Sequence, residues 1–278
     1  MLDCGERQLT LTRTVVMGIL NVTPDSFSDG GVFLSRDRAL RHAVQMVEEG
    51  AGIIDIGGES TRPGAQPVSV QEELDRVIPV IEAVRDAADV LISIDTSKPE
   101  VMRAAVAGGA GMINDVLALR APGALQAAAD LNVPVCLMHI QGEPRTMQKD
   151  PHYADVVSEV RDFLRARMQA CVAAGLSPQK LIIDPGFGFG KNLDHNLRLL
   201  RNLKEFAVLG APLLVGLSRK SMIAAALNLP VDGRLYASVA LALIAAQNGA
   251  QIVRVHDVRA TYEALRMQEI VMETRVAG

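Results

Sequence analysis

The sequence predicts an α/β protein, a (β/α)8 TIM barrel that occupies residues 1–278 as a single domain. Two observations support this fold: short apolar runs recur eight times along the chain, and the segments between them carry helical signals. The length of 278 residues also fits, since such barrels typically have about 250 residues or more. A doubly wound open sheet is the alternative, but it usually has fewer strands and a glycine-rich first turn, GxGxxG, which this chain lacks after its first run.

The predicted strands are the apolar runs, each of which ends in polar residues or glycine. In chain order they cover 15–20, 52–58, 91–95, 111–115, 133–139, 180–186, 212–218 and 251–257. Short runs of this kind, bounded by turn residues, are typical of strands that are buried on both faces of a parallel sheet. The segment before Val15, CGERQLTLT, is expected to form a strand or hairpin that covers the floor of the barrel.

Helices are predicted between these strands from capping residues and apolar spacing. Ser69 and Glu72 form a capping-box pattern before the helix EELDRVIPVIEAV, in which Pro79 should cause a mild kink. The apolar spacing of YADVVSEVRDFLRARMQACVAAG predicts a long helix that stops at Gly175. Pro99 marks the first turn of another helix. No linker or low-complexity stretch divides the chain, which supports a single domain.

Composition argues against several classes of protein. The formal net charge is −4, so nucleic-acid binding has no global electrostatic support, and an anionic ligand must meet a local cluster of basic residues. Cys4, Cys136 and Cys171 form no CxxC pair and are expected to be reduced thiols of a cytoplasmic protein. The N-terminus has no apolar signal-peptide core, and no apolar run reaches the ~18 residues of a membrane span. We therefore expect a soluble protein without nucleic-acid or membrane partners.

Polar side chains follow the predicted strands at every position around the barrel. Because barrel enzymes carry their sites where strands end, these side chains are expected to converge on one ligand site. They are Asn21, the segment GGESTRPG, Asp95, Asn114, His139, Asp184, Ser218, Lys220, Arg254 and His256. A barrel built for stability alone would not need this pattern.

Two kinds of recognition are represented among these groups. Planar donors and acceptors, which suit the edge of a polar heterocycle, come from Asp95, Asn114, Asp184 and Lys220. Cations and an oxygen ligand, which suit a phosphate group alone or with Mg2+, come from Arg62, Arg254, His256 and Asn21. Two buried carboxylates that face N–H donors at a ring edge favour a pterin or purine over a sugar.

Several of these residues also have a purely structural interpretation when taken alone. Asp95 could be the N-cap of the following helix, and Arg254 could pair with a nearby carboxylate such as Asp257. His139 is better explained as a buried structural histidine than as a ligand. Phe187 and Phe189 could both be core, although the glycines around them indicate a close backbone approach and at least one ring at the site. Only the joint occurrence at all strand ends favours a ligand site.

The chain contains a series of long motifs in a fixed order. They are MGILNVTPDSFSDGG, DIGGESTRPGA, SIDTSKPEV, INDV, LMHIQGEPRTMQ, DPGFGFGKN, GLSRKSM and RVHDV. Together they resemble the motif set of bacterial dihydropteroate synthase, and the resemblance runs from about residue 9 to about residue 270. The resemblance implies a (β/α)8 barrel, often a homodimer, that works in folate synthesis and is the target of sulfonamides. Members join 6-hydroxymethyl-7,8-dihydropterin pyrophosphate to 4-aminobenzoate, which gives 7,8-dihydropteroate and pyrophosphate.

The resemblance also implies roles for single residues, with Asp95, Lys220 and Arg254 as the catalytic candidates. The pterin would be held by Asp95, Asn114, Met138, Asp184, Phe189 and Lys220. The pyrophosphate would be bound by Thr61, Arg62, Arg254 and His256, and Mg2+ by Asn21. The 4-aminobenzoate would be surrounded by Phe27, Arg62, Pro63, Ser218 and Lys220.

The implied reaction breaks a carbon–oxygen bond, so it is an alkyl transfer that needs no nucleophilic side chain. Mg2+ and the cations would neutralise the leaving pyrophosphate, and Asp95 would stabilise a cation-like pterin methylene. The oxygen-rich segment VTPDSFSDGG, residues 22–31, is expected to close over the pyrophosphate as a lid hinged at Gly30 and Gly31, and STRPGA is expected to form a second such loop. Two rival interpretations are a pterin-binding methyl-transfer domain and an inactive pterin-binding paralogue.

Overall fold

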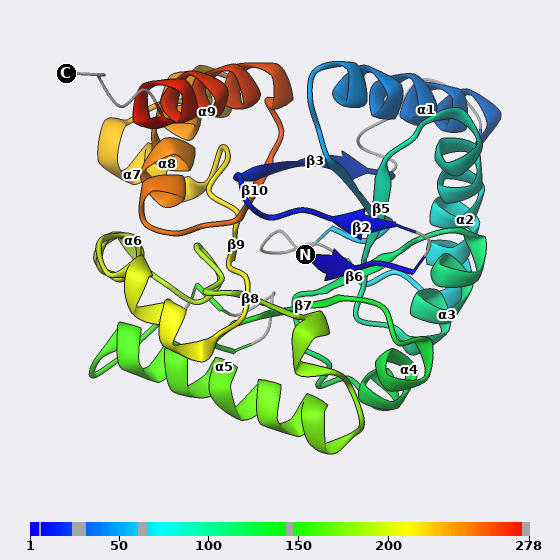
Figure 1. The fold of residues 1–278 in the computed structure, drawn as a ribbon, viewed down its shortest axis with the longest axis horizontal. Coiled ribbons are helices and arrows are strands. Elements are labelled where there is room, and N and C mark those ends of the chain that lie inside the picture. The colour runs from blue at the N-terminus through cyan, green and yellow to red at the C-terminus, as the bar shows by residue number, and fades with distance from the viewer. Residues whose placement is uncertain (6, 24–31, 61–65, 143–146, 149, 274–278) are drawn as a thin grey trace.

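A barrel of parallel strands surrounded by helices makes up the fold (Figure 1). The computed structural model describes residues 1–5, 7–23, 32–60, 66–142, 147–148 and 150–273, and within them eight parallel strands form one sheet that nearly closes on itself. The strands are β3 (Val15–Asn21), β4 (Ile53–Gly57), β5 (Leu91–Asp95), β6 (Met112–Asp115), β7 (Val135–Met138), β8 (Leu181–Asp184), β9 (Leu214–Val215) and β10 (Ile252–Val255). The predicted (β/α)8 fold and its strands are confirmed.

Strand order follows chain order around the barrel, which distinguishes it from the doubly wound alternative. From β3 the pairing runs through β4, β5, β6 and β7 to β8, and in the other direction through β10 to β9. The register aligns the strand ends: Asp95 lies opposite Gly57 on one side and Asn114 on the other. Between β8 and β9, the described residues are linked by the bridge Ile183–Leu213 and by the hydrogen bond from the N–H of Ile183 to the carbonyl of Pro212, at 2.9 Å.

Helices follow the barrel strands and pack against their outer faces. They are α1 (Val32–Glu48), α2 (Val70–Ala87), α3 (Pro99–Gly108), α4 (Ala124–Leu131), α5 (Val156–Ala173), α6 (Leu193–Arg201), α7 (Ser221–Leu227), α8 (Leu235–Gln247) and α9 (Val258–Glu273), with short 3-10 turns η2 (Pro178–Lys180), η3 (Leu203–Leu209) and η4 (Val231–Arg234). Ser69 caps α2 as predicted, because its hydroxyl accepts the N–H of Glu72 at 3.2 Å. The side chain of Glu72 pairs with Arg76.

The N-terminal segment forms a hairpin across the barrel floor, as predicted. Its strands β1 (Leu2–Asp3) and β2 (Gln8–Leu9) pair in antiparallel fashion. Figure 1 shows this pair lying across the centre of the ring of helices. Leu2 and Cys4 are buried against the inward-facing side chains of the barrel strands, which include Met17, Ile53, Leu91, Met112, Ile182, Leu214 and Ile252. The hairpin therefore seals one end of the barrel with apolar contacts.

The main apolar core lies between the barrel wall and the helices, and two smaller clusters lie elsewhere. One is the floor beneath the hairpin. The other contains Met138, Ile140 and Met147, with Val116, Leu117 and Phe189 packed against them. Among the described helices, no single one is long and apolar enough to cross a membrane, and only the bent pair Ser221–Leu227 and Val231–Gln247 meets that test together.

Candidate active site

The described residues of the predicted site gather at the carboxyl ends of the barrel strands. Asn21, Asp95, Met138 and Asp184 are the last residues of β3, β5, β7 and β8, and Asn114 and Arg254 lie near the ends of β6 and β10. Ser218, Lys220 and His256 follow β9 and β10 within a few residues. The predicted positions Phe27, Thr61, Arg62 and Pro63, and with them most of both predicted lid loops, lie outside the described residues.

Arg254 connects three strands at the centre of this site. Its Nε lies 2.6 Å from Oδ2 of Asp55, and its Nη2 lies 2.7 Å from Oδ2 of Asp95. The alternative in which Arg254 pairs with Asp257 is wrong, because Asp257 instead binds Arg219 through both carboxylate oxygens. The alternative in which Asp95 caps the next helix is also wrong, since the N-cap of α3 is Lys98 and Asp95 is committed to the guanidinium.

Asp55 is a site residue that sequence reasoning missed. It lies on β4 with its side chain fully buried, and its Oδ2 accepts a hydrogen bond from Nδ2 of Asn114 at 3.0 Å as well as the contact with Arg254. Within the described part of the chain, its other oxygen, Oδ1, has no hydrogen-bond partner, and neither has the hydroxyl of Ser93 opposite it on β5. Two buried polar atoms of this kind are the usual setting for an internal water. The detectable signal was a carboxylate in the middle of the apolar run GIIDIGG.

Burial shifts the ionisation of the carboxylates in this centre. It raises the pKa of Asp95 to about 7, a rise that Arg254 opposes and Asp55 reinforces. It also raises the pKa of Asp184, with Lys220 opposing. Burial works against the charge of Arg254 too, but Asp55 and Asp95 outweigh it and raise the pKa of the guanidinium. The centre therefore holds one stable cation and carboxylates that gain from further N–H donors or cations.

Lys220 and Phe189 form a second part of the site beside Asp184. The ammonium nitrogen of Lys220 lies 4.6 Å from the centroid of the Phe189 ring and donates to the carbonyl of Phe187. Burial lowers the pKa of Lys220 to about 8. Phe187 is fully buried in the core, whereas Phe189 is half-buried beside Met138. One ring of the pair is core and the other lies at the strand ends, which agrees with the expectation drawn from the flanking glycines.

The loop that carries Phe189 is held by a buried lysine. Nζ of Lys191 donates to the carbonyls of Gly186 and Phe189 at 2.9 and 3.0 Å, and to Nδ1 of His139 at 2.8 Å. Burial lowers the pKa of His139 to about 2, so this ring is neutral and structural, as expected. Gly186 has φ +69°, and a Cβ there would lie 1.9 Å from the carbonyl oxygen of His139, so the loop tolerates only glycine at this position.

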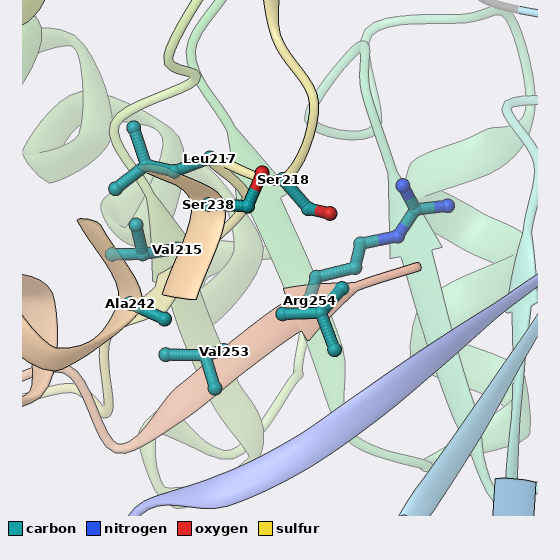
Figure 2. A pocket seen from close by; sticks show the side chains of 8 residues that line it. Val215, Leu217, Ser218, Ser238, Ala242, Val253 and Arg254 are labelled. Atoms are coloured by element: carbon teal, nitrogen blue, oxygen red, sulfur yellow. The ribbon is translucent and has the colours of Figure 1, made fainter. Parts of the chain in front are cut away.

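Ser218 and His256 pair at the ends of β9 and β10. The hydroxyl of Ser218 accepts the backbone N–H of His256 at 3.1 Å and lies 3.0 Å from Nδ1 of its ring. If the Ser218 proton is directed to Nδ1, the imidazole carries its own proton on Nε2. Figure 2 shows Val215, Leu217, Ala242 and Val253 gathered on one side, while the guanidinium of Arg254 extends away from them.

The donor set at the strand ends fits Mg2+ only as a partner of a bound phosphate. Asn21 offers one amide oxygen at the end of β3 and is half-buried. The described residues contain no group of three or more His, Cys, Asp or Glu side chains arranged around a metal. Mg2+ commonly binds proteins through one or two oxygen ligands, with water and substrate phosphates filling the rest of its octahedron. One asparagine is therefore compatible with Mg2+ bound to a diphosphate.

The chemistry available here is recognition and charge stabilisation rather than covalent catalysis. Burial raises the thiol pKa of Cys4 to about 11 and of Cys171 to about 11, and it raises that of Cys136 well above its usual value, so none of the three is a ready nucleophile. At this end of the barrel Asp95 pairs with Arg254, Asp184 lies in the field of Lys220, and Asn114 lies near the end of β6, between the strands of the two carboxylates. This arrangement suits a planar ligand that has N–H donors at its edge and an anionic group.

Comparison with known proteins gives concordant matches over nearly the full chain. A family model described as "Pterin binding enzyme" matches residues 17–256. The dihydropteroate synthase of Escherichia coli (strain K12) is 55% identical over 267 residues, which cover 96% of this chain and 95% of that protein.

Two solved structures have closely similar folds. One is Xanthomonas albilineans dihydropteroate synthase with 4-aminobenzoic acid, at a TM-score of 0.93 and 54% identity over 98% of both chains. The other is the same organism's enzyme in complex with 7,8-dihydropteroate, at a TM-score of 0.90 and 52% identity, covering 98% of this chain and 99% of that one. The similarity is thus one of sequence and of fold together.

Proposed function

The chain belongs to the dihydropteroate synthase family, and from that premise we propose which of its residues carry the reaction. It condenses 6-hydroxymethyl-7,8-dihydropterin pyrophosphate with 4-aminobenzoate, forming 7,8-dihydropteroate and pyrophosphate in folate synthesis. The observation that carries the residue assignment is the buried set of polar groups at the ends of β5, β6 and β8. Asp95 binds the guanidinium of Arg254 directly, and Asn114 binds Asp55, which is the second partner of that guanidinium.

Asp184, Asn114 and Asp95 bind the polar edge of the pterin. Oδ1 of Asp184 already accepts the N–H of Gly186 at 2.7 Å, which leaves Oδ2 directed to ring N–H donors. A buried carboxylate whose pKa is raised gains more from such donors than an exposed one, because water does not compete for it. Met138 and Phe189 contribute apolar contacts to the pterin faces, and Lys220 lies above the Phe189 ring beside the same pocket.

The carbon–oxygen bond of the pterin methylene breaks with its electron pair going to the pyrophosphate oxygen. The methylene becomes cation-like, and the Asp95 carboxylate, whose anionic form is favoured by its contact with Arg254, stabilises that charge. The lone pair of the 4-aminobenzoate amine then forms the new carbon–nitrogen bond, and the amine releases a proton to solvent. Arg254 and His256 supply positive charge or an N–H donor to the leaving group.

Asn21 would hold Mg2+ together with the pyrophosphate, and the ion would supply further positive charge to that leaving group. Ser218 and Lys220 contribute to the 4-aminobenzoate pocket, where the hydrogen bond to His256 fixes the Ser218 hydroxyl. The remaining proposed contacts come from Phe27, Thr61, Arg62 and Pro63, outside the described residues.

We further propose a cytoplasmic homodimer that associates through α8. This helix is apolar on every side, yet Tyr236, Ala240 and Ile244, spaced four residues apart, form an exposed stripe along it. A helix of such composition is normally buried all round, which supports a second copy as its cover.

The buried free thiols suit a reducing compartment. Sedimentation at the mass of one chain would contradict the dimer, and recovery of the protein outside the cytoplasm would contradict the location.

The function is tested by measuring pyrophosphate release when both substrates and Mg2+ are supplied together. We expect release that requires 4-aminobenzoate and Mg2+ and is abolished by a chelator. A methyl-transfer barrel would release no pyrophosphate, and an inactive paralogue would bind the pterin without turnover. The control variant Asp194→Asn changes an exposed carboxylate on α6 and should leave the rate unchanged.

A further inference from the structure

The turn that follows β6 has an unfavourable backbone conformation. Ala118 and Leu119 are consecutive residues with φ of +53° and +57°, in the left-handed region, and both are buried. Side chains with a Cβ rarely adopt this region, and two in succession are rarer still. Such a turn persists only where surrounding groups hold it.

Two sets of hydrogen bonds hold this turn from opposite sides. From within, the carboxylate of Asp115 accepts the N–H groups of Leu117 and Leu119 at 2.8 and 2.7 Å. From outside, Arg167 on α5 donates through Nε to the carbonyl of Ala118 at 2.8 Å and through Nη2 to the carbonyl of Leu119 at 3.2 Å. The guanidinium thus binds the carbonyls of both left-handed residues, forty-eight positions or more away along the chain.

The same turn forms a wall of the proposed pterin pocket. It begins two residues after Asn114, and its side chains Val116 and Leu117 pack against the cluster that contains Met138 and Phe189. A change in the turn would therefore move apolar atoms beside the ring and alter the backbone that follows Asn114. Arg167 reaches the turn from α5, in the helix layer.

We propose that Arg167 is a positioning residue for pterin binding, which acts by holding the left-handed turn 116–119 against the pocket. This rests on the proposed pterin site. Without its guanidinium two buried carbonyls lose their donors, and the turn relaxes toward a conformation that costs less for Ala118 and Leu119. The pocket wall then shifts, while Arg254, Lys220 and the groups around the pyrophosphate stay where they are.

The test compares Arg167→Ala with Arg165→Ala in steady-state kinetics and in calorimetric titration of the pterin. Arg165 is the matched control, because it lies on the same helix and its ion pair is with Asp162 of that helix. We expect the pterin KM of Arg167→Ala to rise about fivefold to tenfold, as the loss of two hydrogen bonds would predict. Its kcat and its KM for 4-aminobenzoate should stay within about twofold of the parent, a split that general destabilisation does not produce.

A second substitution tests the mechanism. Ala118→Gly removes the penalty for the left-handed conformation, so it should restore most of the pterin affinity when added to Arg167→Ala. Arg167→Gln keeps one donor nitrogen, so its KM for the pterin should lie between those of the parent and of Arg167→Ala. This variant replaces the alanine variant in the test if the latter does not fold.

The outcomes separate this proposal from the function on which it rests. An unchanged pterin KM in Arg167→Ala, together with a raised KM in Asp184→Asn, overturns the role of Arg167 and leaves the pterin site intact. Unchanged values in both variants overturn the pterin site and the role of Arg167 with it. A raised KM that Ala118→Gly fails to lower overturns the claim that Arg167 acts through the turn.

Discussion

Arg254 is the residue on which the electrostatics of the centre depend. One guanidinium lies between Asp55 and Asp95, so the trio carries an excess of negative charge when both carboxylates are ionised. A buried ion pair contributes little net stability when intact, but removing one partner leaves an uncompensated buried charge and is strongly destabilising. The same cation therefore supports the fold at the strand ends and favours the anionic form of Asp95, on which the proposed mechanism depends.

We expect Arg254→Ala to slow turnover by about tenfold to a hundredfold, equivalent to roughly 1.5–3 kcal/mol of lost charge-assisted contact. It should also lower the free energy of unfolding, because Asp55 and Asp95 then face each other without a cation. Arg254→Lys restores a charge but cannot bridge both carboxylates. Its turnover rate should therefore fall between that of the parent and that of Arg254→Ala. The measurement is pyrophosphate release at saturating substrates beside a denaturant melt. Turnover near that of the parent would remove Arg254 from the catalytic set.

Asp184→Asn tests recognition of the pterin edge. Because the N–H of Gly186 is 2.7 Å from Oδ1, the asparagine should keep its oxygen there and direct its amide donors to the ring N–H groups. Two donors that face each other leave a buried N–H group without an acceptor, which costs about 1–3 kcal/mol. The affinity for the pterin, measured by calorimetry, should therefore weaken at least about tenfold. Equal affinity in the two proteins would put Asp184 outside the pocket.

Sequence alone could identify the residues at strand ends but not all their partners. Asp95, Asn114 and Asp184 were predictable because each ends a short apolar run, and this local pattern needs no tertiary knowledge. The Arg254–Asp55 pair joins positions 199 residues apart, so it appears only when the barrel closes. Asp55 was missed for that reason, and the pairing of Arg254 with Asp257 was wrong because proximity along the chain did not match proximity across the barrel.

At the scale of elements, the apolar runs located every barrel strand, and the lengths were less accurate. The run 212–218 predicted a strand as long as its neighbours, whereas β9 contains only Leu214 and Val215. Pro212 lacks the N–H that a longer ladder would use, and the chain leaves the sheet at Gly216 for the turn that carries Ser218 and Lys220. Apolar composition records burial, and in this run burial extends beyond the hydrogen-bonded strand.

The loops after β3 and β4 are expected to decide the order in which the ligands bind. The first would bring Phe27 and the second Pro63 to the 4-aminobenzoate pocket, and Asn21 at the base of the first would bind Mg2+. Fixing a loop costs about 1–2 kcal/mol per residue, which a small ligand does not supply by itself. We therefore expect 4-aminobenzoate to bind poorly to the free enzyme and tightly once pterin and Mg-pyrophosphate are present. Calorimetric titration with and without those ligands decides, and equal affinities would refute ordered loop closure.

Over the whole molecule, the hairpin and the site occupy opposite ends of one barrel. Leu2 and Cys4 fill the floor, and the charged centre of Asp55, Asp95 and Arg254 lies above it toward the carboxyl ends of the strands. Substrates therefore enter and leave through one opening. The covered floor was predicted from the short segment before Val15 alone. The physical reason for a cover is that an open barrel end would leave Met17 and Ile53 in contact with water.

Among the described residues, few backbone contacts join β8 to β9. Asp184 ends the first of these strands and Lys220 follows the second, so a pterin that contacts both spans a gap where the backbone has few rungs of its own. We expect such a substrate to link β8 and β9, so that part of its binding energy stabilises the closed barrel. When the pterin is added, amide hydrogen exchange should therefore slow most around Ile183 and Leu214. It should slow less at β4 and β5, which are paired with each other along their full length. Uniform slowing around the barrel would mean that the ring is already rigid before any substrate arrives.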